Sequence, residues 1–458
     1  MFLQKVRSEG LSHNSYFVSD GGQAAVIDPR RDCEVYLDIA AATGSRIIHI
    51  FETHRNEDYA TGSLELSART GASIYHGAAL DFSFGRPVRE GDTFHVGRLE
   101  LEVLETPGHT PESISLVLRD LSVSRDPIFL FSGDALFSGD VGRTDLLGPE
   151  KAEWAAGTLY DSLHTKILPL GDGVIVCPAH GAGSVCGGDI SDLEFTTVGY
   201  ERAHNPCFLL GREEFVARKK AEHHYRPPYF TTMEKVNREG PPVLSHLPRP
   251  VPLDPKEFAE KVGAGAQVID VRSPEAFGGG HVPGSISLWK DGIPSFAGWV
   301  LSYDRPILVV DDPGEPPGTV VQRLVRLGYD AFAGYLAGGF PAWSRAGKTV
   351  DKVETWSAAT LHDSLDKERL VLLDVRDRKN RDAHGFIMGS RHIYVGELPS
   401  RLGELPRNQK VAVYCDAGFK GSLAASILRA AGFERVANVL GGFAAWRAAG
   451  YPVERRSP

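Results

Sequence analysis

The chain has 458 residues, of which 42% are hydrophobic and 24% are charged, and its formal net charge is −9 at pH 7. This composition is typical of globular proteins, and the negative charge without a long Lys or Arg run argues against nucleic acid or an anionic membrane as a partner. The sequence has no apolar stretch near the length of about 20 residues that spans a membrane, so we expect a cytoplasmic protein. At roughly 150 residues per domain, the length predicts about three domains.

The first half of the chain alternates short apolar runs with polar, turn-rich segments. Such runs are typical of buried strands, and helical candidates at 34–42 and 151–163 lie between some of them. We expect strands at 24–27, 46–51, 99–104, 113–118, 128–131 and 173–176. The pattern predicts an α/β fold in which helices cover the sheets.

Four of these strands lead into segments rich in metal-binding side chains, at 53–59, 106–110, 131–134 and 177–181. In layered α/β proteins, sites are commonly built at strand ends. The four segments resemble the metallo-β-lactamase superfamily, whose signature is His-x-His-x-Asp-His followed by a further His, Asp and His. The resemblance implies an αββα sandwich for residues 1–245.

The departures from this signature are informative. Asn56 and Tyr59 stand where dinuclear zinc members have histidines, whereas His54, His109 and Asp134 are kept. Two histidines and one carboxylate form the set associated with a mononuclear non-haem Fe(II) that keeps coordination positions open. The persulfide dioxygenase branch of the superfamily uses this triad, and the segment 132–145 is similar to that branch's own pattern. The resemblance therefore implies one Fe(II) per chain, held by these three residues.

The same resemblance suggests roles for three further residues. Arg143 is expected to orient an anionic substrate, and the alternative is a structural ion pair with Asp145. Asp58 and His180 are expected near the metal, where they hold ligands and water without binding the ion. Relatives often have Asp-Tyr after this last histidine, but here Gly-Ala follows at 181–182. The thiol carrier therefore stays open among glutathione, coenzyme A, bacillithiol and inorganic polysulfide.

The five cysteines are odd in number and never occur as a CxxC pair, which disfavours a disulfide framework and a structural zinc site. Each thiol has to be judged by its surroundings. Cys207 precedes an apolar run at 208–210, so it is either a small core residue or a thiol that holds sulfur near the pocket.

A proline-rich linker at 246–254 precedes two copies of one α/β unit. The copies are recognised by three pairs of matching segments: 268–272 and 372–376, 307–314 and 411–418, and 338–343 and 441–446. We therefore predict domains at 255–350 and 351–458. Each copy resembles the rhodanese fold, which implies a central, mostly parallel sheet covered by helices.

In active rhodaneses, a strand leads into a short loop that begins with cysteine and is followed by a helix. The segment 411–418 has this pattern, and Cys415 occupies the place of that cysteine. Backbone N–H groups and the helix N-terminus would converge on its sulfur, lower the pKa and stabilise a thiolate or persulfide anion. We expect Lys420 to take part in catalysis where many relatives carry Arg, and Gly418 and Gly421 to contact the substrate. The alternative for Cys415 is an inert buried thiol.

The middle copy has Asp311 at the cysteine position and prolines at 316 and 317. A carboxylate cannot form the disulfide-like bond that stores sulfane sulfur, and proline removes backbone donors. We expect this copy to be catalytically inactive and to act as a spacer or a subunit interface.

Together these features predict an enzyme that oxidises a small thiol persulfide with O₂ to sulfite and thiol, with sulfur transfer at Cys415 linking sulfite and persulfide to thiosulfate. The direction of transfer and the oligomeric state, including a homo-oligomer, stay open. One alternative is a dinuclear-zinc thioester hydrolase of the glyoxalase II type, which Asn56 and Tyr59 disfavour. Another is a non-catalytic sulfur carrier.

Overall fold

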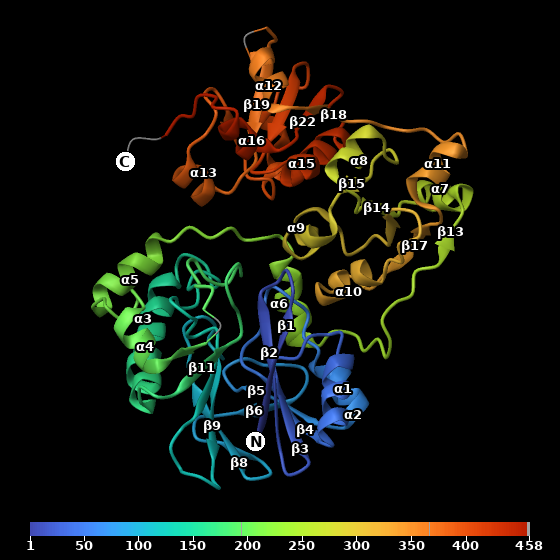
Figure 1. Cartoon of the computed structure of the whole chain (residues 1–458). Helices are drawn as coiled ribbons and strands as arrows, with labels where there is room; N and C mark the ends of the chain where they lie inside the picture. The colour runs from blue at the N-terminus through green and yellow to red at the C-terminus, as the bar shows by residue number, and fades with distance from the viewer. Residues whose placement is uncertain (194, 366, 456–458) are drawn as a thin grey trace. The chain divides into compact units, whose positions relative to one another are not determined.

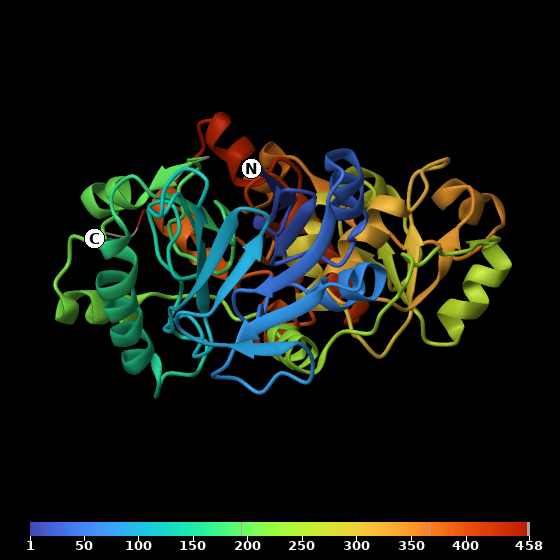
Figure 2. The ribbon, with the colours of Figure 1, turned by 90° about the horizontal axis from the view of Figure 1, so that it is seen from below.

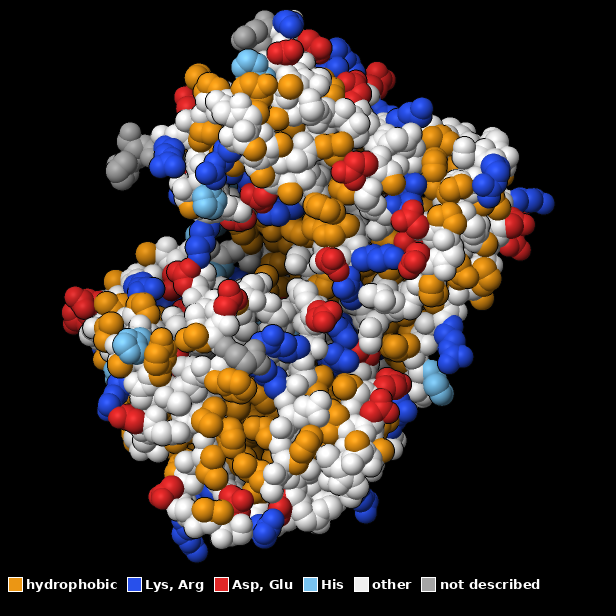
Figure 3. Space-filling view, viewed as in Figure 1, with side chains coloured by type: hydrophobic (Ala, Val, Ile, Leu, Met, Phe, Trp, Pro, Cys, Tyr) orange, Lys and Arg blue, Asp and Glu red, His pale blue; other side chains and the backbone are white. Residues whose placement is uncertain are grey.

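The structure is a computed structural model that describes residues 1–193, 195–365 and 367–455 (Figure 1). Its contacts divide the chain into two compact units, the first made of Met1–Leu247 with Val325–Gly328 and the second of the remaining chain. The finer division into three domains stays a prediction. Among the described residues, no helix is long and apolar enough to cross a membrane. On the face shown in Figure 3, acidic and basic side chains are intermixed.

The first unit is built on two six-stranded sheets. The first sheet has the order β1 (Phe2–Ser8), β2 (His13–Asp20), β3 (Gln23–Ile27), β4 (Arg46–Glu52), β5 (Ser73–Gly77), β6 (Arg86–Val88). The second has the order β12 (Thr196–Thr197), β11 (Ile175–Pro178), β10 (Phe129–Gly133), β9 (Ile114–Asp120), β8 (Leu99–Glu105), β7 (Thr93–Val96).

One apolar core lies between the two sheets. Every second residue of β8 enters it, at Leu99, Leu101 and Val103, and Phe51 of β4 enters from the other sheet. This period of two is the reason why these segments form strands with one face on the core. Figure 2 shows the two sheets of this unit side by side, in blue and cyan.

Helices cover the outer faces of both sheets. Side chains of α1 (Glu34–Thr43) and α2 (Ser63–Thr70) pack on the first sheet, and those of α3 (Ala152–Ser162) and α5 (Arg212–Ala221) on the second. The unit also contains α4 (Val198–His204), α6 (Phe230–Glu239) and the short turns η1 (Leu163–Ile167) and η2 (Leu168–Leu170). The predicted αββα sandwich is confirmed.

Strand β2 was not predicted from the sequence, although all eight of its residues are buried. It contains Ser15, whose hydroxyl forms a hydrogen bond with that of Tyr36 on α1. Because polar residues occupy both ends of the strand, it has no long apolar run that a sequence pattern could detect.

The second unit contains two five-stranded parallel sheets with the same strand order. The first is β13 (Pro252–Leu253), β17 (Phe332–Leu336), β16 (Ile307–Val310), β14 (Gln267–Asp270), β15 (Ile286–Ser287). The second is β18 (Glu354–Trp356), β22 (Val436–Val439), β21 (Lys410–Tyr414), β19 (Leu370–Asp374), β20 (Arg391–His392). The repeat in the sequence is therefore a repeat of topology, and the predicted parallel α/β class is confirmed.

The helices of this unit follow the same order in both copies. In the first copy they are α7 (Pro255–Gly263), α8 (Pro274–Gly279), η3 (Lys290–Gly292), α9 (Ile293–Val300), α10 (Gly318–Arg326) and α11 (Gly339–Arg345). In the second they are α12 (Ala358–Leu365), α13 (Arg378–His384), α14 (Leu398–Arg401), η4 (Leu402–Glu404), α15 (Phe419–Ala430) and α16 (Gly442–Ala448).

The repeated Asp-Val-Arg motif forms a buried ion pair in each copy. Arg376 donates from Nε and Nη2 to the two carboxylate oxygens of Asp374, at 2.9 and 2.7 Å, and to a backbone carbonyl. Arg272 and Asp270 form the same two-pronged pair. The planar guanidinium fits a carboxylate in this way, so the motif holds the end of the strand in place.

Candidate functional site

The three predicted metal ligands follow strands that end at one edge of the sandwich. His54 lies just after β4, His109 follows β8, and Asp134 comes directly after β10. Each residue is buried, and their ligand atoms all lie within 4.8 Å of one another. The fold therefore brings together the triad that the sequence singled out.

The imidazole of His54 is oriented by a chain of hydrogen bonds. The Thr53 hydroxyl donates to Asp28 at 2.8 Å and lies 2.9 Å from Nδ1 of His54, which makes Nδ1–H the donor to that oxygen. The backbone N–H of Thr53 also donates to Asp28, at 2.7 Å. Burial lowers the pKa of His54 to about 4, so its ring is neutral and Nε2 carries a free lone pair. This tautomer is the one that a metal needs.

The ring of His109 is also held by a hydrogen bond at Nδ1, in this case with a backbone carbonyl. Its Nδ1 lies 2.9 Å from the backbone carbonyl of Arg143, and its buried Nε2 forms no hydrogen bond with a described residue. Nε2 is 3.4 Å from Oδ2 of Asp134. Burial lowers the pKa of His109, but the neighbouring carboxylates of Glu57 and Asp134 outweigh it and raise the pKa above the usual value. This site thus attracts a cation at Nε2.

Asp134 presents one oxygen to the ligand cluster and the other to His180. Its Oδ1 accepts a hydrogen bond from Nδ1 of His180 at 2.7 Å, while Oδ2 lies 3.7 Å from Nε2 of His54. Nε2 of His180 is 3.0 Å from Oδ2 of Asp58. Burial lowers the pKa of His180, yet the two carboxylates raise it well above its usual value. His180 therefore bridges Asp58 and Asp134, next to the cluster, where the sequence analysis expected both residues.

The donor set fits a mononuclear non-haem iron. Two imidazole nitrogens and one carboxylate oxygen converge, and two of these buried atoms, Nε2 of His109 and Oδ2 of Asp134, form no hydrogen bond with the described residues. An unsatisfied buried polar atom costs about 1–3 kcal/mol, a cost that an ion would remove. Bound iron would be held by His54, His109 and Asp134.

The two residues that replace histidines of the zinc signature, Asn56 and Tyr59, make other contacts. The amide of Asn56 donates to the backbone carbonyl of His54 at 3.2 Å. The ring of Tyr59 packs against that of His13, with 4.0 Å between ring centroids. Beside the triad lies a second group that could hold a metal ion, Asp58, His180 and Cys186, whose ligand atoms are also within 4.8 Å of one another.

We expect Thr53→Val to weaken iron binding about 10- to 100-fold, the usual cost of losing an outer partner of a metal-bound histidine. Valine keeps the shape but removes the hydroxyl that holds Nδ1 of His54. The iron affinity can be measured by competition with a chelator, and Thr53→Ser, which keeps the hydroxyl, is the matched control. Equal affinity of the valine variant and the native protein would contradict the orienting role of Thr53.

The side-chain contacts of Arg143 bear on the two roles expected from the sequence, substrate orientation and an ion pair with Asp145. Its side chain is buried, and Nε and Nη2 donate to the carboxylate of Asp145 at 2.6 and 2.7 Å. Nη1 donates to the backbone carbonyls of Val185 and Tyr225. These contacts favour the structural ion pair, the alternative weighed from the sequence. The residue serves the site through its backbone carbonyl, which holds His109.

Glu57 was missed by the sequence analysis because it occupies a variable position of the signature. Its carboxylate is buried, and Oε1 lies 3.4 Å from Nε2 of His109. Burial raises the pKa of Glu57, but the charge of His109 outweighs it and the pKa lies below the usual value. A carboxylate next to Asp58 inside a metal motif was the signal that could have identified it.

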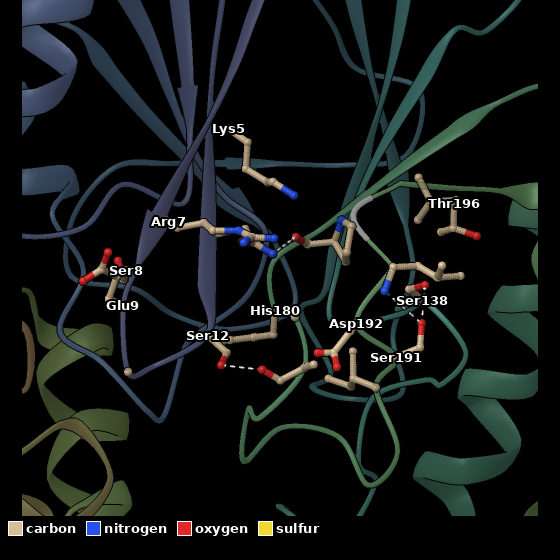
Figure 4. Close-up of a pocket in the computed structure, with 18 residues that line it drawn as sticks. Lys5, Arg7, Ser8, Glu9, Ser12, Ser138, His180, Ser191, Asp192 and Thr196 are labelled. Carbon is tan, nitrogen blue, oxygen red and sulfur yellow. Dashed lines mark hydrogen bonds between the residues drawn. The ribbon is translucent and has the colours of Figure 1, made fainter. Parts of the chain in front are cut away.

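A cavity of about 350 Å³ lies beside His180, between β1 and the loop that follows β11 (Figure 4). Lys5 and Arg7, two residues apart on the edge strand β1, line it together with Ser12 and Asp192. The volume is within the range of small-molecule sites. No motif marked these residues in the sequence.

The predicted sulfur-transfer site lies between β21 and α15. The backbone N–H of Gly418 donates to Sγ of Cys415 at 3.1 Å, and the N–H groups of Ala417 and Gly421 also lower the pKa of this thiol. Burial has the larger effect, and it raises the pKa above the usual value. The expected net lowering of the pKa is therefore wrong, because the thiol is almost fully buried.

Both predicted glycines of this loop are required by geometry. Gly418 has φ +104°, which favours glycine, and a Cβ on Gly421 would lie 2.3 Å from the side-chain oxygen of Asn438. Lys420 is in the loop, but its ammonium is 3.0 Å from Asp416 and 3.6 Å from Asp377. The roles of Lys420 in catalysis and of the glycines in substrate binding stay predictions.

The equivalent loop of the first copy begins with Asp311 after β16, and its carboxylate is 2.9 Å from Nζ of Lys290. An ion pair therefore stands where the second copy has its thiol. Cys207 packs in the apolar core under α3 and α5, and burial raises its pKa to about 11. This environment favours the core-residue alternative for Cys207.

Comparisons with known proteins match the two parts of the chain to two different families. The family model "Metallo-beta-lactamase superfamily" matches residues 9–180, and "Rhodanese-like domain" matches 254–346 and 357–449. Mouse mitochondrial "Persulfide dioxygenase ETHE1" is 33% identical over 204 residues, 42% of this chain and 70% of the relative. A "Hydroxyacylglutathione hydrolase" of Rhodospirillum rubrum is 38% identical over 153 residues, 32% of this chain and 54% of the relative. A crystal structure described as a metallo-β-lactamase from Staphylococcus aureus has 31% identity and a TM-score of 0.66, covering 73% of this chain and 98% of its own.

Proposed function

The chain belongs to the metallo-β-lactamase superfamily and carries two rhodanese-like domains, and on this basis we propose that it is an iron-dependent persulfide dioxygenase fused to a sulfurtransferase. The observation that carries the proposal is the convergence of His54, His109 and Asp134 with both Nδ1 atoms already occupied. The persulfide dioxygenase of mouse is among the relatives with matching sequence.

The proposed reaction converts R–SSH, O₂ and H₂O to R–SH and sulfurous acid, which ionises to sulfite. Fe(II), when bound, supplies the electron transfer between the outer sulfur and O₂. The protein's own part would be to supply two neutral imidazoles and one carboxylate, a set that leaves coordination positions of the ion free for substrate and O₂. His180, which is bonded to Asp134, keeps that carboxylate turned toward the site.

The proposed second reaction takes place at Cys415. The thiolate attacks the outer sulfur of a persulfide, which releases R–S⁻ and leaves a cysteine persulfide. Sulfite then attacks that outer sulfur and leaves as thiosulfate, which returns the electron pair of the S–S bond to the cysteine thiolate. Backbone N–H groups around Sγ would stabilise the anionic sulfur in both states. The reverse sequence uses the same atoms.

The hydrolase alternative is supported by the similarity to hydroxyacylglutathione hydrolases. Such chemistry uses a second metal. Asp58, His180 and Cys186 lie close enough to hold one, but Asn56 and Tyr59 stand where the zinc signature has histidines, which disfavours a dinuclear zinc centre. The sulfur-carrier alternative requires no metal at all, which leaves the buried, unsatisfied ligand atoms unexplained.

One assay separates the three functions. The full-length chain is loaded anaerobically with Fe(II) and given glutathione persulfide, while O₂ uptake, sulfite and thiosulfate are followed. We expect O₂ uptake with sulfite formation from the iron protein and none from the zinc-loaded protein. Stoichiometric zinc in the isolated protein, hydrolysis of lactoylglutathione and no O₂ uptake after iron loading would instead establish the hydrolase. Iron-independent thiosulfate formation alone would establish the carrier or transferase.

A further inference from the structure

Glu57 is a buried charge that the ligand triad does not use. It lies between Asn56 and Asp58 in the loop after β4, and its side chain is 0% exposed. Neither carboxylate oxygen accepts a hydrogen bond from any residue that the structure describes. A buried carboxylate without hydrogen bonds is strongly unfavourable unless a cation balances it, so the surroundings of Glu57 must supply one.

Among the described residues, the carboxylate of Glu57 forms its ion pair with a metal-ligand nitrogen. Oε1 of Glu57 lies 3.4 Å from Nε2 of His109, the same separation as between that nitrogen and Oδ2 of Asp134. Two ligands bound to one ion at about 2.1 Å lie about 3.0 Å apart at a right angle and about 3.4 Å apart at the tetrahedral angle. Glu57 and Asp134 are therefore equally distant from His109, and at a distance that suits a shared ion.

Without a metal, protonated His109 can balance the charge of Glu57 in an ion pair. This ion pair is lost when a metal binds. Nε2 of His109 then carries the metal in place of a proton and has nothing to donate to Oε1. Arg55 is nearby, yet its guanidinium lies 3.7 Å from Glu234. The charges of Arg55 and Arg143 act on Glu57 from farther away, since neither forms an ion pair with it among the described residues, and a bound metal would be the cation in direct contact with its carboxylate.

Charge counting leads to the same result. Fe(II) with the single carboxylate of Asp134 has a net charge of +1 in a buried site, whereas a second carboxylate makes the assembly neutral. A neutral assembly avoids the cost of a buried net charge. Glu57 is not yet within 4.8 Å of all three triad atoms, but its long side chain has no hydrogen bond to break before it turns toward the ion.

We propose that Glu57 is a fourth protein ligand of the iron in the substrate-free enzyme and gives up its position to the incoming persulfide anion. The inference rests on the proposed function for the identity of the metal and of the substrate. The proton that R–SSH loses on binding passes to the released carboxylate of Glu57, so the exchange leaves the charge of the site unchanged.

The test uses Co(II), whose visible absorption reports its coordination number, in the full-length chain under anaerobic conditions and without persulfide. We expect Glu57→Gln to bind Co(II) about 10- to 100-fold more weakly, comparable to the loss of other metal-site partners. Its absorption should become more intense as the coordination number falls. The matched control is Glu52→Gln, a buried carboxyl on β4 whose hydrogen bonds come from Thr61 and Ser63, and it should behave as native.

Native affinity and a native spectrum in Glu57→Gln would overturn the proposal. Should that variant fail to fold by circular dichroism, Glu57→Asp, which shortens the side chain by one methylene, takes its place, and unchanged binding there overturns the proposal equally. The Co(II) measurement needs neither O₂ nor persulfide. It therefore tests the role of Glu57 as a ligand independently of the proposed dioxygenase function. A native protein that binds metal through Glu57 but never consumes O₂ would contradict only the proposed function.

Discussion

His54→Ala is expected to abolish O₂ uptake with a persulfide and to leave sulfur transfer at Cys415 intact. Nε2 of His54 is one of three converging donors, and alanine leaves the ion with one imidazole. Loss of an outer partner alone costs about 10- to 100-fold in metal affinity or activity, so loss of a direct ligand should exceed about 100-fold. The measurements are iron per chain after anaerobic loading, O₂ consumption, and thiosulfate formed from persulfide and added sulfite.

The matched control for this experiment is His95→Ala. His95 is an exposed histidine on β7 in the same unit, and its removal should change neither the iron content nor O₂ uptake. An His54→Ala protein that keeps stoichiometric iron and consumes O₂ at the native rate would contradict the assignment of the metal site. Loss of sulfur transfer together with O₂ uptake would point to misfolding and calls for a thermal melt of both variants.

Cys415→Ser is expected to show the opposite pattern, with sulfur transfer lost and O₂ uptake kept. A serine hydroxyl is a poor nucleophile and cannot form the sulfur–sulfur bond that stores sulfane sulfur, so the rate should fall by more than about 1,000-fold. The substitution keeps the size of the buried side chain and the glycine-rich loop around it. Thiosulfate formation and O₂ consumption are measured on the same preparation.

Cys207→Ala is the control, because Cys207 is a buried thiol in the core of the other unit. It should retain both activities. If Cys415→Ser lost O₂ uptake as well, the two reactions would share a site. If Cys207→Ala lost sulfur transfer, the interpretation of Cys207 as a core residue would be wrong.

The sequence was sufficient to select three residues whose ligand atoms converge in the fold and to recognise the repeated units. His54, His109 and Asp134 each follow an apolar run that forms a strand, and strands of a layered fold end at common edges. The repeat could be read because matching segments occupy the same places in two sheets of identical order. Strand β2 could not be read, since its buried polar residues give no apolar pattern.

For the candidate metal site, the sequence by itself determined the set of possible ligands. Because Asn56 and Tyr59 stand where the zinc signature has histidines, two histidines and one aspartate remain. Only the tertiary structure decided what each neighbour does. It pairs Arg143 with Asp145, points Glu57 at His109, and sets His180 between two carboxylates. The physical reason is that burial and hydrogen bonding depend on contacts between residues far apart in the chain, such as His180 and Asp134, which are 46 positions apart. The spacing of residues within a motif does not predict such long-range contacts.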